Sequence, residues 1–268
     1  MGHVLIAGCG YLGTALGVRL AAEGHVVWGL SRSPGELPTS IRGIEGDLGV
    51  PNTLRNLPAV DWVFYLAGGG HAGVRYLLGA LAAGRQRITR LFYGSGLDVY
   101  GHRGGEWVDE DSAVAPATAR AREMHESEQL VAAAPWPSTA VRLGEVYGPS
   151  RLGVLGHVMR GEPVAVPAPA AHVSPIHRDD AVGALVHLLG RRESEAVYLL
   201  VDRTPVPRVE MLEWLGSRTG RGLPPLTESA EAHPDVRAMS DRLVETGFAF
   251  CYPSFREGFV PLLSRLGR

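Results

Sequence analysis

A glycine-rich turn near the N-terminus constrains the fold of this chain more than any other feature. Residues 8–13 carry glycine in the spacing Gly-x-Gly-x-x-Gly, directly after an apolar run and at the start of an amphipathic one. The first glycine of such a loop permits a tight turn, the second lets a pyrophosphate approach the backbone, and the third lets the helix pack on the strand. The N-terminus of the helix then offers N–H groups and a partial positive charge to phosphates. The residues expected to bind a dinucleotide here are Gly8, Cys9, Gly10, Tyr11, Leu12 and Gly13.

Apolar runs typical of strands alternate with amphipathic runs typical of helices along most of the chain. Strands are expected at residues 3–7, 26–30, 62–66, 91–93, 139–143 and 197–201. Helices are expected at residues 12–23, 74–83, 120–133 and 180–189. Such alternation is typical of right-handed crossover units on a parallel sheet, and nearly continuous apolar strands indicate burial on both faces. The predicted fold class is therefore α/β, a doubly wound parallel sheet of the Rossmann type with a small C-terminal lobe.

The same pattern suggests two domains. Residues 1–150 are expected to form the dinucleotide-binding domain, and residues 151–268 a lobe that binds the substrate. Within the second part, residues 176–201 are expected to cross back to the sheet. Two further helices are expected in the lobe, at residues 210–219 and 234–246.

Composition excludes several classes of partner. The 268 residues carry a net charge of −2 and no basic block, so we expect neither nucleic acid nor a charged membrane surface as a partner. No apolar run approaches the roughly 20 residues that span a bilayer, and no basic leader precedes the first strand, so the cytoplasm is the expected location. Cys9 and Cys251 are the two cysteines, too few and too far apart for a disulfide framework or a zinc site, and no metal is expected.

The end of the second expected strand bears on the choice of cofactor. Ser31 and Arg32 stand where an NAD-selective site usually carries an acidic residue for the ribose 2′-hydroxyl. A guanidinium suits a 2′-phosphate, so we expect NADP in preference to NAD. Asp47, followed by Leu48, is expected to accept a hydrogen bond from the adenine amino group, although an Asp that caps a turn remains the alternative. Loop residues after later strands complete the expected cofactor set: Ala67, Gly68 and Ser95.

Further motifs resemble those of the NAD-dependent epimerase/dehydratase family, in the extended and atypical branch of the short-chain dehydrogenase/reductase superfamily. They are Gly46-Asp47-Leu48, Val99-Tyr100-Gly101, Arg142, Val146-Tyr147-Gly148-Pro149, Ile176-His177-Arg178-Asp179-Asp180, and the C-terminal Gly247-Phe248 with Tyr252-Pro253-Ser254-Phe255-Arg256-Glu257-Gly258. The last stretch looks like the end of atypical members that tend to use NADP. The resemblance implies a small-molecule substrate, chemistry beside the nicotinamide, and a monomer or homodimer.

The chain departs from this family at the catalytic set. Members use a Ser or Thr, a Tyr, and a Lys four residues after the Tyr, whose ammonium lowers the pKa of the phenol. The sequence contains 26 arginines and no lysine. No Tyr lies between Tyr100 and Tyr147. Alignment on the family's helix puts Arg120 in place of the Tyr and Met124 in place of the Lys. Standard carbonyl reduction is therefore not expected.

Two carboxylates stand where the family usually has small or neutral residues. Asp98 precedes Tyr100 by two positions, and Glu145 precedes Tyr147 by two. Both should lie at the carboxyl ends of strands, where a desolvated carboxylate can act as a general acid or base. The alternatives are an ion pair with Arg120 or Arg142 and a solvated loop charge.

Two other side chains join the candidate catalytic set. Tyr100 carries the phenol nearest to the lost Ser position and could donate a proton, unless it serves only for packing. Arg120 cannot donate a proton at neutral pH, but it can bind an anionic or carbonyl oxygen. The predicted catalytic residues are thus Asp98, Glu145, Tyr100 and Arg120.

Two classes of function agree with these residues. The first is an NAD(P)-binding enzyme of small-molecule metabolism with a rearranged site, for a redox step or for a proton transfer such as epimerisation, elimination or ring closure. The second is a non-catalytic module that senses NADP(H), since a sensor would keep the phosphate loop and lose the catalytic Tyr and Lys. A scaffold that binds no nucleotide is the third possibility.

Overall fold

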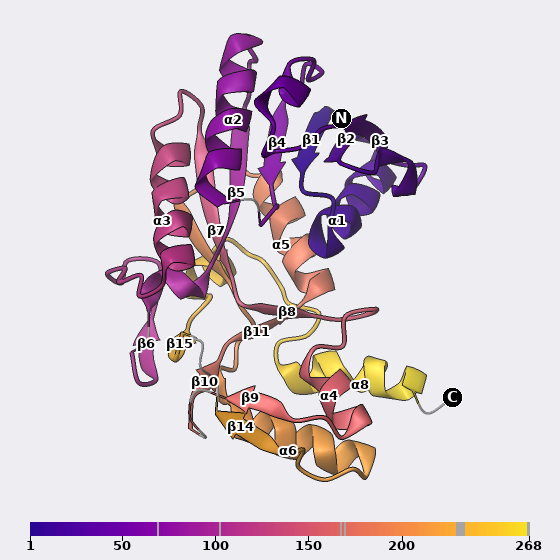
Figure 1. Cartoon of the computed structure of the whole chain (residues 1–268), viewed down its shortest axis with the longest axis vertical. Coiled ribbons are helices and arrows are strands. Elements are labelled where there is room, and N and C mark those ends of the chain that lie inside the picture. The colour runs from indigo at the N-terminus through magenta and orange to yellow at the C-terminus, as the bar shows by residue number, and fades with distance from the viewer. Residues whose placement is uncertain (69, 102, 167, 169, 229–233, 267–268) are drawn as a thin grey trace. The chain divides into compact units, whose positions relative to one another are not determined.

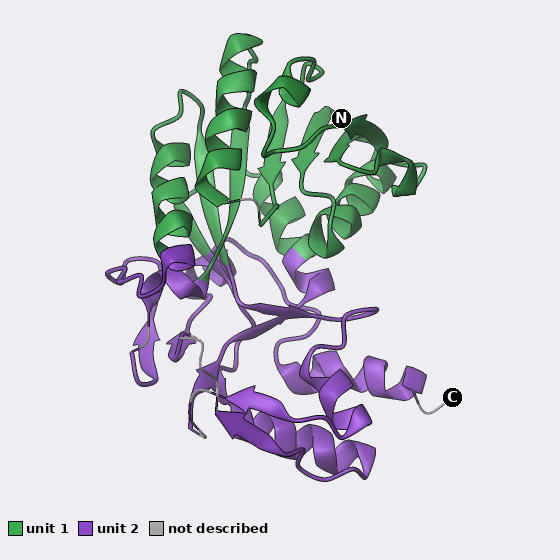
Figure 2. Cartoon of the chain, in the orientation of Figure 1, with its two compact units in different colours: residues 1–96, 122–142, 182–198 green, residues 97–121, 143–181, 199–268 purple. Residues whose placement is uncertain are grey.

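The computed structural model describes residues 1–68, 70–101, 103–166, 168, 170–228 and 234–266 (Figure 1). The chain divides into two compact units, each made of three segments (Figure 2). Unit 1 consists of Met1–Gly96, Arg122–Arg142 and Val182–Tyr198, and unit 2 of Leu97–Ala121, Leu143–Ala181 and Leu199–Arg268. This division differs from the boundary expected near residue 150, because residues 97–121 already belong to unit 2. Residues 182–198 belong to unit 1 and lie within the stretch 176–201 that was expected to cross back to the sheet.

One parallel sheet dominates unit 1. Within the described residues its seven strands follow the order β3-β2-β1-β4-β5-β7-β12. They are β1 (His3–Ala7), β2 (Val26–Ser31), β3 (Arg42–Glu45), β4 (Trp62–Tyr65), β5 (Arg90–Gly96), β7 (Ser138–Leu143) and β12 (Val197–Leu200). β1 runs parallel to both β2 and β4, and the pairs β2–β3 and β4–β5 are parallel as well. The doubly wound α/β fold is confirmed, and the strand order reverses between β1 and β4, where such sheets bind ligands.

Four helices flank this sheet: α1 (Tyr11–Ala22), α2 (Gly70–Ala83), α3 (Ala119–Ala132) and α5 (Arg178–Leu189). The period of two along the strands sends alternate side chains to opposite faces. Leu5 and Val63 pack in one cluster with Leu77 of α2 and Val131 of α3, so these two helices cover one face (Figure 1). The intervening Ile6 points to the other face and meets α1.

Buried Arg90 ties β5 to the end of α5. Its guanidinium donates to the carbonyl oxygens of Leu188, Arg191 and Arg192 at 3.0–3.3 Å. A cation is stabilising at this end of a helix, where the last carbonyls have no partner inside the helix. The contact anchors the crossover that precedes β12.

Unit 2 consists of short strand pairs and helices around its own core. Its strands are β6 (Glu106–Val108), β8 (Glu145–Tyr147), β9 (Val164–Val166), β10 (His172–Val173), β11 (Pro175–His177), β13 (Val206–Pro207), β14 (Leu226–Glu228) and β15 (Val236–Ala238). Its helices are α4 (Val154–Arg160), α6 (Arg208–Thr219), α7 (Asp241–Glu245) and α8 (Phe255–Leu266). Leu155 of α4, Leu212 of α6 and Phe259 of α8 belong to one cluster of buried apolar side chains.

One of the two helices predicted for this unit is not observed as expected. Residues 234–246 do not form a continuous helix, because Val236 pairs with Glu106 in a parallel β15–β6 ladder and the N–H of Met239 donates to Val108. Tertiary strand pairing therefore overrides the helical pattern until α7 begins at Asp241. No helix within the described ranges is long and apolar enough to cross a bilayer.

Candidate functional site

The predicted phosphate loop of unit 1 has the geometry that its glycines suggest. Gly8 has φ +106°, and a Cβ added there would lie 2.4 Å from the backbone N of Ala67. A Cβ at Gly13 would lie 2.1 Å from the carbonyl oxygen of Gly8, so the helix approaches the strand too closely for a side chain. A Cβ at Gly10 would meet nothing within 4 Å. The loop is therefore tight at its ends and open in the middle, the arrangement a pyrophosphate requires.

The loop's cysteine faces inward. The Cys9 thiol points toward the carbonyl oxygen of Ile6 at 3.6 Å, and a Cβ added at Gly29 of β2 would lie 2.8 Å from its sulfur. Burial raises the pKa of Cys9 to about 11, so the thiol stays protonated at neutral pH. Cys9 thus fills space under the loop.

The residues after β2 and β3 are partly engaged in their own turns. The Ser31 hydroxyl accepts the N–H of Ser33 at 3.1 Å, and Arg32 is exposed. Oδ1 of Asp47 accepts the N–H of Gly49 at 2.8 Å. This oxygen of Asp47 therefore caps a turn, as the alternative interpretation of the sequence suggested.

Ser95 belongs to a buried polar network in unit 1. Its hydroxyl donates to Oε1 of Glu128 at 2.5 Å, and Glu128 accepts two more hydrogen bonds from Arg142, at 3.0 and 2.8 Å. The side chains of Glu128 and Arg142 are only 7% and 6% exposed. The structure thus directs the Ser95 hydroxyl to Glu128, and it pairs Arg142 with Glu128.

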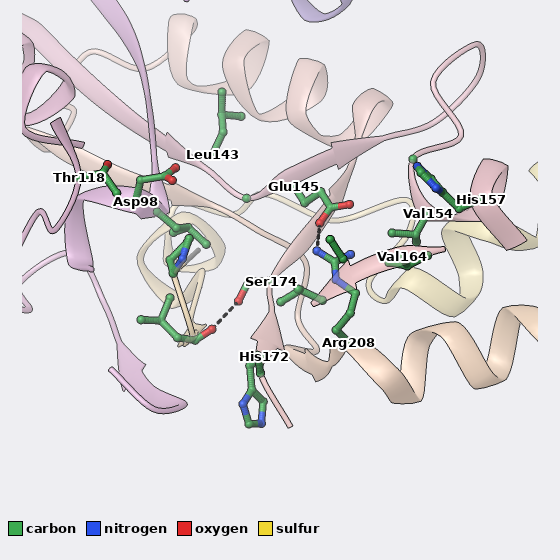
Figure 3. Close-up of a pocket in the computed structure, with 18 of the residues that line it drawn as sticks. Asp98, Thr118, Leu143, Glu145, Val154, His157, Val164, His172, Ser174 and Arg208 are labelled. Carbon is green, nitrogen blue, oxygen red and sulfur yellow. Dashed lines mark hydrogen bonds and ion pairs between the residues drawn. The ribbon is translucent and has the colours of Figure 1, made fainter. Parts of the chain in front are cut away.

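Three of the four predicted catalytic residues line one cavity of unit 2. The cavity has a volume of about 1080 Å³, and Asp98, Arg120 and Glu145 are in its wall. Figure 3 labels Asp98 and Glu145 among the residues that line it. A short 3₁₀ turn after β5, Leu97–Tyr100, carries Asp98, the first turn of α3 carries Arg120, and β8 carries Glu145. Chain segments far apart in sequence therefore converge on one space.

Asp98 and Arg120 are charged groups of this wall that are not engaged with another side chain in the part of the chain that the structure describes. Asp98 is half-buried and Arg120 is exposed, and among the described residues neither side chain has a hydrogen bond or ion pair. Thr118, also in the wall, accepts the N–H of Ala121 at 3.0 Å and so caps the start of α3 beside Arg120.

Glu145 has a partner that the sequence did not suggest. It forms an ion pair with Nη2 of Arg208, the first residue of α6, and not with Arg120 or Arg142, which were one of the alternatives for this carboxylate (Figure 3). Arg208 and a further arginine, Arg151, also line the cavity. Nothing in the sequence distinguishes these two from the other arginines, so sequence analysis missed them.

Tyr100 does not line the cavity. It is fully buried, and its hydroxyl donates to the carbonyl oxygen of Asp109 at 2.6 Å. A phenol whose proton is held by a backbone carbonyl inside the protein has no access to a ligand in this conformation. The structure therefore favours the packing alternative for Tyr100.

The histidines and acids offer no metal centre in the part of the chain that the structure describes, where no cluster of three or more potential ligands occurs. His177 is buried, and its Nδ1 accepts the N–H of Asp179 at 3.2 Å. Burial lowers the pKa of His177, so the ring is neutral at neutral pH.

The fold and the glycine loop together define a protein of the dinucleotide-binding Rossmann class. The model of the NAD-dependent epimerase/dehydratase family matches residues 4–198. The chain belongs to this family.

Solved structures agree with this assignment. A Methylobacillus flagellatus protein assigned to the NAD-dependent epimerases/dehydratases is 31% identical, with a TM-score of 0.86 over 100% of this chain and 99% of that one. A conserved protein of unknown function from Silicibacter pomeroyi is 26% identical, with a TM-score of 0.85 over 99% of each chain. MoeE5, solved with UDP-glucuronic acid and NAD, is 23% identical and shares the fold with a TM-score of 0.85 over 100% of both chains. No curated protein matches the chain.

Proposed function

We propose that this protein is an NAD(P)-dependent enzyme of small-molecule metabolism in which Asp98 takes over the proton transfer of the missing Tyr and Lys. The observation that carries the proposal is the position of Asp98: a half-buried carboxylate without a partner among the described residues, in the wall of a cavity that also holds Arg120. A carboxylate in such a place is suited to general acid–base catalysis.

The cofactor would be held by unit 1. The backbone of residues 8–13 would bind the pyrophosphate, because Gly10 leaves that surface open. Arg32, exposed after β2, supports NADP in preference to NAD, since a guanidinium suits a 2′-phosphate. When bound, the nicotinamide supplies a site that accepts and returns a hydride.

The cavity of unit 2 would hold the substrate. Asp98 would take or return the proton, and the Arg120 guanidinium would stabilise an oxygen that becomes negative. MoeE5 is solved with UDP-glucuronic acid and with UDP-glucose, and nucleotide sugars are therefore the first substrates to try. A redox step and a proton transfer such as epimerisation both agree with this arrangement.

The experiment has two stages. Purified protein is first titrated with NADP and NAD by calorimetry, and is then incubated with each dinucleotide and UDP-sugars while products are separated and reduced nicotinamide is followed by absorbance. For a substrate that turns over, Asp98→Asn is expected to lower kcat by about 100-fold or more and to leave dinucleotide affinity unchanged. Asp111→Asn, at a carboxylate that is 82% exposed and outside the cavity wall, is the matched control.

Particular outcomes contradict the proposal. If Asp98→Asn leaves turnover intact, Asp98 does not carry the proton transfer, and if Glu145→Gln leaves it intact as well, neither carboxylate carries the chemistry. If turnover proceeds while the bound nicotinamide never changes its redox state, the redox form of the proposal is wrong and the proton-transfer form remains.

A second candidate is a module that senses NADP(H). The absence of lysine and the Glu145–Arg208 ion pair favour it, because a carboxylate held by a guanidinium is less available as a base. Dinucleotide binding without turnover of any candidate substrate, together with a change in protease sensitivity on binding, would support the sensor over the enzyme.

A further inference from the structure

The guanidinium of Arg208 has one nitrogen in an ion pair and another without a hydrogen-bond partner among the described residues. Its Nη2 pairs with Glu145, whereas its Nη1 is buried and has no hydrogen-bond partner within the described residues. A guanidinium presents a planar fork that matches the two oxygens of a carboxylate or phosphate group. An unpartnered buried N–H is costly, so a ligand that fills the fork gains more than the Glu145 contact provides.

The two partners of this ion pair are held differently. The Arg208 side chain is 16% exposed, and that of Glu145 is 39% exposed. Arg208 begins α6, a helix of 12 residues that packs into the core of unit 2 through Leu212 and Leu215. Glu145 lies on a strand of three residues, and its side chain has open solvent on one side. Glu145 is therefore the partner that can swing away.

The charges of the cavity wall favour an incoming anion. Arg120 and Arg151 line the same cavity as Arg208, and the acidic side chains of this wall are Asp98 and Glu145. If Glu145 turns toward solvent, three guanidinium groups and one carboxylate remain in the wall. Such a wall attracts an anionic group before direct contact is made.

We propose that Arg208 binds the anionic group of the substrate, and that Glu145 occupies this place as an internal competitor until a carboxylate or phosphate displaces it. The inference rests on the proposed function in one respect, namely that the substrate enters this cavity. Displacement would turn the Glu145 carboxylate toward solvent and leave Asp98 as the carboxylate of the wall.

The proposal requires opposite effects from the two partners. Removing the competitor must strengthen anion binding, whereas removing the fork must weaken it. An ion pair that served only stability would give the same sign for both changes. Glu145→Gln keeps the size of the side chain and loses its charge, and Arg208→Gln removes the fork.

Calorimetric titration of the full chain saturated with NADP, or with NAD if only NAD binds, tests these signs. The probes are UDP-glucose, which carries phosphates, glucuronic acid, which carries a carboxylate, and UDP-glucuronic acid, which carries both. Glu145→Gln is expected to bind the recognised probe about tenfold more tightly than the wild type, and Arg208→Gln about tenfold more weakly. Arg208→Lys, with the charge but not the fork, is expected to lie between Arg208→Gln and the wild type.

An ion pair elsewhere in unit 2 provides the matched control. Arg256 and Glu210 meet at 2.7 Å, with side chains 43% and 50% exposed, and neither lines the cavity. Arg256→Gln and Glu210→Gln should leave the affinity for all three probes unchanged. Thermal unfolding of every variant checks that the affinities compare folded proteins.

The outcomes separate the possibilities. Tighter binding by Glu145→Gln of the two UDP-sugars but not of glucuronic acid assigns the fork to a phosphate. Tighter binding of glucuronic acid and UDP-glucuronic acid but not of UDP-glucose assigns it to a carboxylate. Unchanged or weaker binding by folded Glu145→Gln overturns the proposal, and so does the absence of binding of all three probes to both wild type and Glu145→Gln. Loss of dinucleotide binding would contradict the proposed function and leave these titrations interpretable, since they can be repeated on the chain without dinucleotide.

Discussion

The two units present their candidate binding surfaces in different ways. In unit 1 the surface is backbone: Gly8 and Gly13 make tight contacts, and Gly10 leaves a space open. In unit 2 the surface consists of charged side chains, with Asp98 and Arg208 among those in the cavity wall. A backbone surface depends on where glycines stand in one short stretch, whereas a side-chain surface depends on how distant segments fold together.

One ion pair from each unit shows a related difference, in burial. Glu128 and Arg142 in unit 1 are 7% and 6% exposed and joined by two hydrogen bonds. Glu145 and Arg208 in unit 2 are 39% and 16% exposed. The first pair is part of a core, and the second is open to exchange with a ligand.

The largest expected effect tests this difference. Arg142→Met should lower the free energy of unfolding by about 3–5 kcal/mol, because Glu128 would remain buried and charged without its partner. Arg208→Met should lower it by less than about 1 kcal/mol, since Glu145 can turn to solvent. Urea denaturation measures both, and equal losses would show that the two pairs play the same structural role.

Unit 2 also buries a carboxyl group away from its cavity. Burial raises the pKa of Asp202 to about 8, and the nearby Glu257 and Asp180 add to the rise, although N–H groups of Thr204 and Phe255 oppose it. Oδ2 of Asp202 is buried without a hydrogen-bond partner in the described part of the chain. A neutral carboxylic acid is therefore the form that suits this site.

The sign of the pH effect follows from this shift. In the unfolded chain Asp202 has a pKa near 4, so the folded protein binds more protons between about pH 4 and pH 8. Stability should fall as pH rises through this window, by at most about 1.4 kcal/mol per pH unit. Burial lowers the pKa of His177, so below about pH 6.5 the unfolded chain binds more protons at this residue than the folded one. The contribution of His177 to stability therefore rises with pH there, opposite to that of Asp202.

Asp202→Asn isolates the effect, because His177 is the same in both proteins and Asn can keep the hydrogen bond from Thr204. Relative to the variant, the wild type should lose unfolding free energy as pH rises from 4 to 8. A difference that is flat over this range would mean that Asp202 is ionised in the folded protein.

Within the glycine loop, two substitutions of the same size should act differently. Gly13→Ala places a methyl group against the Gly8 carbonyl oxygen and should cost about 1–3 kcal/mol of stability together with dinucleotide affinity. Gly10→Ala adds the methyl group in open space, so stability should stay unchanged while dinucleotide affinity falls. Thermal unfolding and calorimetry separate the two effects. Full affinity in Gly10→Ala would place the pyrophosphate elsewhere.

The fold was predictable where the signal is local. Six strands of the main sheet were expected from apolar runs, and the seventh, β3, was missed because Arg42, Gly43 and Glu45 are exposed and leave no apolar pattern. The helix expected at residues 234–246 failed because pairing with β6 decides that segment.

The candidate site was predictable only in part. The sequence pointed to Asp98, Arg120 and Glu145 because they depart from the family motifs. The structure places all three in the wall of one cavity. Arg208 is 63 residues away from the carboxylate that it contacts, and no spacing rule connects them. Tyr100 is the opposite case. Its residue type and position in the sequence suggested a proton donor, but the side chain is fully buried.

The smallest expected effect concerns the choice between NADP and NAD. Side chains of both charges lie near the end of β2. Arg32 follows Ser31, and Ser31 is aligned with Glu45 of the neighbouring strand, so a cation and a carboxylate are both candidates to meet the adenosine ribose. Arg32→Gln should weaken NADP binding about tenfold and leave NAD binding unchanged, because only NADP offers a phosphate to the guanidinium. Glu45→Gln should strengthen NADP binding by a smaller factor, since it removes repulsion.

Arg42→Gln is the control for Arg32, because Arg42 lies in the same unit and stacks over the Trp28 ring at 5.3 Å. Calorimetry with both dinucleotides at two salt concentrations checks these effects, which should shrink as salt rises since both groups are exposed. If Glu45→Gln instead weakens NAD and leaves NADP unchanged, the carboxylate holds a ribose hydroxyl and the site selects NAD. The preference would then come from β3, the strand whose sequence carried no signal, and not from the arginine that the sequence made conspicuous.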